Sequence, residues 1–101
     1  MKNMDYEIVI LDRAQDEINQ IYEYYAKISF SVLQSFDNDL EQAYQRLETN
    51  PFFQFRYKGL RALPFKNFPY LAFFTIDEDE KKVSIFSVFN TYQDPKKYPE
   101  L

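Results

Sequence analysis

The chain has 101 residues, the length of a single domain, and its 46% hydrophobic and 20% aromatic residues supply enough apolar material for one folded core. It has no cysteine and no histidine, which excludes disulfides, thiolate metal sites and cysteine nucleophiles and removes the side chain best suited to proton transfer at neutral pH. The net charge of −4 differs from the basic balance that is typical of nucleic-acid-binding domains.

The chain opens with the pattern of a strand followed by a helix. Tyr6–Leu11 alternates between two apolar faces, which predicts a strand. Asp12, with Gln15 three residues later, has the spacing of a capping box and predicts a helix start. Apolar residues at helical spacing carry this helix to about Lys27.

A second helix is predicted after a short turn. Ser31 and Gln34 repeat the capping-box spacing, and Asn50-Pro51 ends the apolar stripe because proline disfavours helical geometry in the residue before it. A turn confined to Ile28–Ser31 predicts that the two helices pack as an antiparallel α-hairpin.

The second half of the chain has the pattern of strands. Leu60–Phe65, Tyr70–Ile76 and Val83–Asn90 are rich in aromatic and β-branched residues. Asp77–Lys82 is a polar turn that makes the last two strands a hairpin, and Thr91–Leu101 is predicted to be irregular because of its two prolines.

The predicted fold class is α+β with the order β-α-α-β-β-β, an antiparallel α-hairpin packed on a small, mostly antiparallel sheet. Residues 1–101 form one domain. No run approaches the ~20 apolar residues of a membrane span, and Ile8–Leu11 is too short for a secretory signal, so we expect a cytoplasmic protein without membrane contact. The residues expected to be mostly buried are Ile18, Ile21, Leu33, Phe36, Leu40, Phe74, Ile85 and Val88.

Charge is divided between the two halves. Residues 1–50 carry four bases against ten acids, a net −6, whereas residues 51–101 carry eight bases against six acids, a net +2. Between Thr49 and Ile76 there is no acid at all, but there are four bases: Arg56, Lys58, Arg61 and Lys66. The helical half is therefore acidic and the sheet half basic.

Aromatic residues alternate with these bases. Two interpretations apply: a basic, aromatic face that meets phosphate or an acidic partner, or core aromatics with solvated bases at the strand edges. For the aromatics the core interpretation is favoured, and for the bases the two are about even. The aromatics are Phe52, Phe53, Phe55, Tyr57, Phe65, Phe68 and Tyr70.

Neither a metal nor an organic cofactor is expected. The acidic run Asp77–Glu80 lacks the glycine and the final glutamate spacing of an EF-hand and is typical of a solvated turn. Gly59 is the only glycine, so there is no glycine-rich phosphate loop.

Three passages, in this order, resemble the RelE/ParE superfamily of type II toxins, which includes plasmid stabilisation proteins. Tyr6–Ala14 leading into Asp16-Glu17-Ile18 is similar to the family's first strand and acidic helix start. Lys58–Leu63 with Phe68–Ile76 resembles its arginine-bearing strand and aromatic hairpin. Val88–Tyr98 resembles its closing motif, in which a strand ends in His-Thr, then Arg, then Asp-Pro or Asn-Pro.

The resemblance implies a toxin neutralised by a co-encoded antitoxin protein and associated with it as an oligomer. It also implies one of two targets, since RelE-like members cleave ribosome-bound mRNA and ParE-like members poison DNA gyrase. Fold alone does not choose between these activities.

The residues that the resemblance assigns to RNA cleavage are Arg61, as a bidentate phosphate ligand, assisted by Lys58, Lys66 or Tyr92. Asn90 stands where the family commonly has His, and Gln93 where it has Arg, so a proton-transfer group and a phosphate ligand are replaced. A salt bridge from Arg61 to the acidic helices is the structural alternative. The expected partner- or phosphate-binding residues are Arg56, Lys58, Arg61, Lys66 and Asn90.

The leading hypothesis is therefore a toxin that acts by binding, in the manner of ParE. The alternatives are a ribosome-dependent mRNA endoribonuclease and a non-toxic protein-interaction module with the same fold. Because the sheet half is basic, we expect an acidic antitoxin segment to bind there, by strand addition or helix docking, with an affinity that salt weakens.

Overall fold

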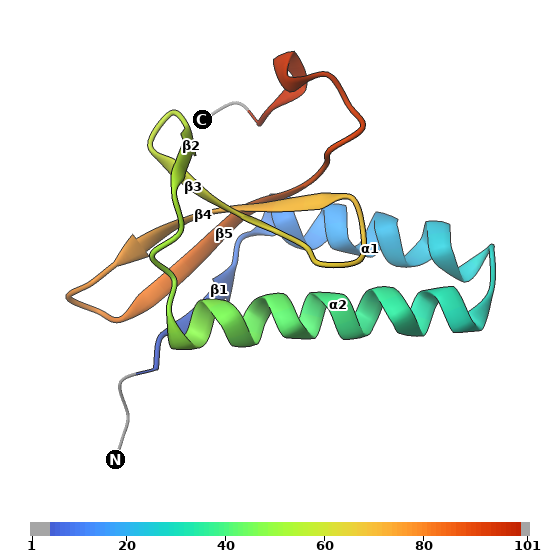
Figure 1. Cartoon of the computed structure of the whole chain (residues 1–101), viewed down its shortest axis with the longest axis horizontal. Helices are drawn as coiled ribbons and strands as arrows, with labels where there is room; N and C mark the ends of the chain where they lie inside the picture. The colour runs from blue at the N-terminus through green and yellow to red at the C-terminus, as the bar shows by residue number, and fades with distance from the viewer. Residues whose placement is uncertain (1–4, 100–101) are drawn as a thin grey trace.

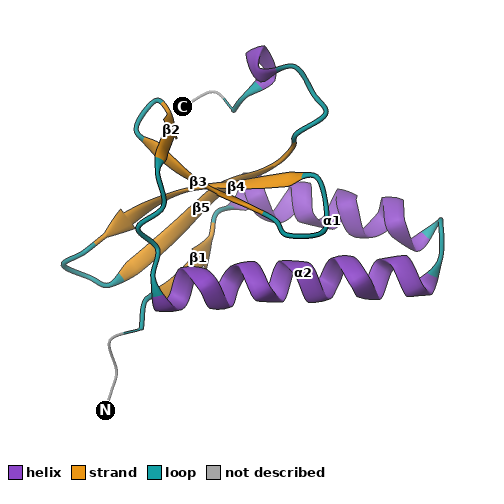
Figure 2. Cartoon of the chain, viewed as in Figure 1, coloured by secondary structure: helices purple, strands orange, loops and turns teal. Residues whose placement is uncertain are grey.

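The computed structural model describes residues 5–99, which form two α-helices on one side of a five-stranded sheet and a short 3-10 turn on the other (Figures 1 and 2). The predicted α+β class and the antiparallel α-hairpin are confirmed. The elements in chain order are β1 (Glu7–Ile10), α1 (Asp12–Ala26), α2 (Phe30–Thr49), β2 (Phe55–Tyr57), β3 (Leu60–Pro64), β4 (Tyr70–Asp77), β5 (Lys82–Asn90) and η1 (Pro95–Lys97).

The sheet has the strand order β1-β5-β4-β3-β2. β1 lies parallel to β5, with Ile8 opposite Val83, and every other neighbouring pair is antiparallel. β2 was not predicted from the sequence. It is only three residues long and pairs with β3 through an irregular register, so it leaves no readable alternation in the sequence.

Both predicted capping boxes are wrong. Leu11, not Asp12, is the N-cap residue of α1, and no side chain caps this helix, so Asp12 lies in the first turn and acts only through the helix dipole. In α2 the cap is Ser29, whose Oγ accepts from the Val32 N–H at 3.1 Å. The helix therefore begins at Phe30, before the predicted Ser31. It ends at Thr49 with Asn50 as its C-cap, as Asn50-Pro51 predicted.

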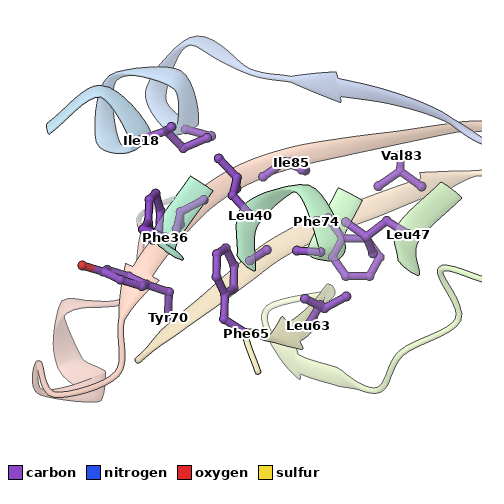
Figure 3. Packing of buried hydrophobic residues seen from close by; sticks show 14 of the residues in the cluster. Ile18, Phe36, Leu40, Leu47, Leu63, Phe65, Tyr70, Phe74, Val83 and Ile85 are labelled. Carbon is purple, nitrogen blue, oxygen red and sulfur yellow. The ribbon is translucent and has the colours of Figure 1, made fainter. Parts of the chain in front are cut away.

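The main core lies between the α-hairpin and the sheet, and Phe36 of α2 is one of its members (Figure 3). This ring is completely buried and contacts aromatic rings from α1 and the sheet. Six of the eight predicted core residues are buried, and Ile21 and Leu33 are half-buried because each lines a hollow in the surface. The rings around Phe36, with centroids at 5.5–6.1 Å, are Tyr22, Tyr25, Phe65, Phe68 and Tyr70.

The opposite face of the sheet has a second, smaller core, which the C-terminal tail covers. Tyr98 places its ring 5.0 Å from the Phe73 ring and 4.9 Å from the Phe89 ring, measured between centroids. It also lies 5.0 Å from Tyr57 of β2. The tail is largely irregular, as predicted, but it covers the aromatic side chains of Phe73 and Phe89 on this face of the sheet.

Two carboxylates connect the helices to the sheet half. Glu17 of α1 accepts from the Ser87 hydroxyl at 2.8 Å and from the Val88 N–H at 3.0 Å, where β1 has ended and no longer covers β5. Asp39 of α2 is 2% exposed and accepts from the backbone N–H groups of Asn67 and Phe68 in the β3–β4 turn. Both acids belong to the acidic half of the chain, and both accept hydrogen bonds from the other half, so they stabilise the fold.

Candidate functional site

The predicted basic residues gather at the β2–β3 edge of the sheet, with one exception. Arg56 and Lys58 are exposed, and Arg61 is half-buried. Lys58 lies in the β2–β3 turn at a φ of 45° and precedes Gly59, whose φ of 79° is natural only for glycine. Lys66 lies in the β3–β4 turn, where it lines a small hollow on the surface of α2 rather than the β2 edge.

The Arg61 guanidinium is held by backbone and rings. Nη1 donates to the Phe53 carbonyl at 2.7 Å. The guanidinium carbon lies 4.1 Å from the Phe55 ring centroid and 5.5 Å from that of Phe52. The structural alternative, a salt bridge from Arg61 to the acidic helices, is not formed, because the one ion pair within residues 5–99 joins Arg13 and Glu17. The phenylalanine contacts and the Phe53 carbonyl fix the guanidinium at the sheet edge instead.

Phe52 and Phe55 correct the prediction that the aromatics between the bases are core residues. Their exposed fractions are 50% and 63%, whereas Phe65 and Tyr70 are buried as predicted. Phe55 is exposed because it lies on an edge strand. The missed strand β2 and the misjudged exposure of Phe55 thus have the same origin.

The closing motif lies at the end of β5. The Asn90 side-chain oxygen accepts from the Tyr92 N–H at 2.8 Å, which forms a local turn. The Thr91 N–H and hydroxyl both donate to the Pro69 carbonyl. Tyr92 is 86% exposed and Gln93 is exposed. Asn90 therefore has a structural role in this turn.

A groove of about 450 Å³ lies between α1 and this end of β5. Its walls combine aromatic and aliphatic side chains with amides and one carboxylate, that of Glu17, which already accepts two hydrogen bonds. Sequence reasoning did not anticipate the groove, since its walls come from segments about 70 residues apart. The lining residues are Glu17, Gln20, Ile21, Tyr24, Tyr25, Pro69, Tyr70, Val88, Phe89, Asn90, Tyr92 and Gln93.

Tyr70, one of the tyrosines of the groove, is a poor proton acceptor at neutral pH. The hydroxyl oxygens of Tyr25 and Tyr70 lie 3.1 Å apart. Burial raises the pKa of Tyr70 well above its usual value, and the hydrogen bond with Tyr25 raises it further. Tyr70 thus stays protonated at physiological pH.

The two groups of predicted site residues are not brought together. Arg61 pairs with Phe74 of β4, while Asn90 pairs with Tyr70 on the other side of the same strand. Four residues along β4 and two strand spacings across separate their backbones by about 16 Å. With Arg61 bound to the Phe53 carbonyl, one phosphate group cannot contact both Arg61 and the closing motif. Lys58 lies in the same β2–β3 hairpin as Arg61, and Tyr92 lies in the same turn as Asn90.

Within residues 5–99, no three His, Cys, Asp or Glu side chains are arranged to hold a metal ion. Over the same residues, neither helix combines the length and hydropathy required to cross a bilayer. The acidic residues Asp77–Glu80 are exposed, and the Asp77 side chain accepts from the Glu80 N–H within the β4–β5 turn.

Comparison with known proteins identifies the family. The family model described as the ParE toxin of the type II toxin–antitoxin system, parDE, matches residues 8–95. The solved structure of a chromosomal ParDE toxin–antitoxin system from P. aeruginosa is similar in fold, with a TM-score of 0.69 and 18% identity over 84% of this chain and 95% of that one. No curated protein sequence matches. The resemblance predicted from the sequence is confirmed, and the chain belongs to the ParE toxin family of type II toxin–antitoxin systems.

Proposed function

We propose that this chain is a toxin that acts in the cytoplasm by binding a cellular target and that a co-encoded antitoxin neutralises it. Its family membership supports a toxin role in general. Binding, rather than RNA cleavage, is the mode of action favoured by the separation between Arg61 and the closing motif.

RNA cleavage requires a base for the 2′-hydroxyl, an acid for the leaving oxygen and a charge that stabilises the phosphate. The chain has no histidine, and the side-chain oxygen of Asn90 is occupied by the Tyr92 N–H. Gln93 cannot neutralise a phosphate, and Arg61 is fixed about 16 Å away, measured between backbones. A protein-binding toxin requires none of these groups, which makes it the function that this geometry supports best.

The test separates binding from cleavage. The wild-type chain, Arg61→Ala and the double variant Asn90→His with Gln93→Arg are expressed without the antitoxin, and cleavage of translated mRNA on ribosomes is measured beside growth. We expect growth arrest by the wild type without mRNA cleavage. Lys96→Ala is a control for the loss of one exposed positive charge.

Each alternative predicts a different result. Strong wild-type cleavage that Arg61→Ala reduces by ~10²–10³ would establish a ribonuclease, since that is the typical effect of removing a pre-organised charge-stabilising donor. Arrest with inhibited DNA supercoiling identifies gyrase as the target. Normal growth at high expression would leave only a non-toxic interaction module.

The antitoxin is tested by co-expression with the product of the adjacent gene. We expect growth to recover and the two chains to purify together. Growth arrest that persists at equal expression of a folded antitoxin would contradict neutralisation by that protein.

A further inference from the structure

The exposed edge of β2 combines an unpaired strand with two exposed phenylalanines and a fixed guanidinium. We propose that this edge binds an acidic, extended segment of the antitoxin, which adds to the sheet beside β2 and directs a carboxylate to Arg61. The inference rests on the proposed function for its partner and goes beyond it by naming the surface and the chemistry of the segment.

The backbone of β2 is available for pairing. β2 is the last strand in the order β1-β5-β4-β3-β2, and within residues 5–99 no strand lies on its outer side. The Ala62 N–H donates to the Gln54 carbonyl at 3.2 Å, so Phe55 and Arg61 face each other as a non-hydrogen-bonded pair, and the backbone N–H and C=O of Phe55 are directed outwards. Such an edge is a template for an added strand, in which main-chain hydrogen bonds supply affinity.

The side chains beside this edge have the composition of a binding hot spot. Phe52 and Phe55 are half or more exposed and lie against the Arg61 guanidinium. Aromatic residues and arginine are the types enriched in such centres. Because Nη1 donates to Phe53, the guanidinium is already ordered, and its other N–H groups remain for a carboxylate.

A neighbouring cavity can accept an apolar side chain of the same segment. It measures about 460 Å³ and opens where β2 stops covering β3, between Phe53–Arg56 on one side and Ala62, Pro64 and Leu71 on the other. Arg46 of α2 also lines it, and its Nη1 donates to the Pro64 carbonyl at 3.2 Å. An extended segment with alternating side chains would place an acid near Arg61 and an apolar residue here.

The positive charge of the β2 edge favours an acidic segment over a second copy of this chain. Arg46, Arg56, Lys58 and Arg61 lie at or beside this edge, and the sequence between Thr49 and Ile76 has no acid. A second copy of this chain, paired symmetrically along β2, would bring like charges together, which is how natural proteins protect sheet edges from self-pairing. An acidic segment is attracted by the same charges.

The experiment measures the affinity of the full-length toxin for the full-length product of the adjacent gene, at 50, 150 and 500 mM NaCl. Phe55→Ala is expected to weaken binding about 10- to 100-fold, the range of hot-spot truncations. Arg56→Glu should weaken it by about 10-fold and flatten the salt dependence. Phe30→Ala is the matched control, because Phe30 is an exposed phenylalanine (71%) at the distant end of the α-hairpin, and it should change the affinity less than about 2-fold.

A second readout tests strand addition itself. Antitoxin binding should slow hydrogen exchange at the Phe55 amide, which points away from β3. Unfolding curves for each variant ensure that a weaker affinity does not arise from a loss of folded toxin.

The outcomes distinguish this inference from the proposed function. If the wild-type chain does not bind the antitoxin at all, the proposed function fails. If it binds, but Phe55→Ala has no more effect than Phe30→Ala, only the inference is overturned. It is also overturned if the toxin alone dimerises through Phe55, or if Phe55→Ala weakens the binding of a single-stranded RNA but not of the antitoxin.

Discussion

Replacing Asp39 of α2 should strongly destabilise the protein, because this buried carboxylate connects the helix to the β3–β4 turn. Its carboxylate is 2% exposed and accepts from the Asn67 N–H at 3.1 Å, the Phe68 N–H at 3.0 Å and the Asn67 side-chain amide at 3.2 Å. Asp39→Ala leaves these donors without an acceptor in a buried place. The loss of hydrogen bonds to a charged group is partly offset by relief of the desolvated charge, so we expect a decrease of about 3–5 kcal/mol in the free energy of unfolding.

Asp39→Asn separates hydrogen bonding from charge. The asparagine oxygen can occupy the position of Oδ2, which accepts from both backbone N–H groups, and a flipped Asn67 amide can accept from the new NH₂. We therefore expect a loss of only about 1–2 kcal/mol.

Urea unfolding followed by circular dichroism measures these differences, with Asn38→Ala on the exposed face of the same helix as a control that should stay within ~0.5 kcal/mol of wild type. If Asp39→Ala costs less than about 1 kcal/mol, or if Asp39→Asn costs as much as Asp39→Ala, the hydrogen bonds to the β3–β4 turn do not have the role given to them here.

Three further predictions concern the helices. Ser29→Ala should cost about 1 kcal/mol of stability in urea unfolding while Ser31→Ala costs little, because only Ser29 caps α2; equal effects would contradict this assignment. Phe36→Ala should cost about 3–5 kcal/mol by the same measurement, since it removes a fully buried ring, and a loss below ~2 kcal/mol would mean that the core collapses around the gap. Burial, together with nearby acids, raises the pKa of Tyr44 to about 12, so its contribution to stability is complete below pH 10 and is lost as the pH rises from 10 to about 12. Urea midpoints at pH 9 and 11 should differ less in Tyr44→Phe than in wild type, and an unchanged difference would count against this cause.

The sequence predicts those elements whose stabilising contacts are local or periodic. The apolar stripe from Leu33 to Leu47 and the Asn50-Pro51 stop define α2, and runs of aromatic and β-branched residues define β3, β4 and β5. It does not predict β2, because three residues cannot display a period. It also indicates the wrong cap for α2, because Gln34 gives Ser31 the capping-box spacing, whereas the geometry of the inter-helix turn makes Ser29 the cap.

The candidate site was predictable in composition but not in arrangement. The lack of acids near Arg61 was visible in the sequence, whereas the ring contacts of this guanidinium depend on an edge strand that the sequence does not reveal. The groove beside α1 depends on Glu17 reaching Ser87 and Val88, about 70 residues later in the chain. Nothing in the sequence around Glu17 distinguishes it from the other acids of α1 or indicates that its partners lie so far along the chain.

The parallel pairing of β1 with β5 governs when this protein can complete its fold during synthesis. Ile8 is made about 75 residues before its partner Val83, and at 5–20 residues per second this gap corresponds to roughly 4–15 s. The α-hairpin consists of local contacts and can form early, but β1 has no neighbouring strand until β5 emerges. The edge of the sheet that β1 forms therefore arises only when β5 has been made, near the end of these 101 residues.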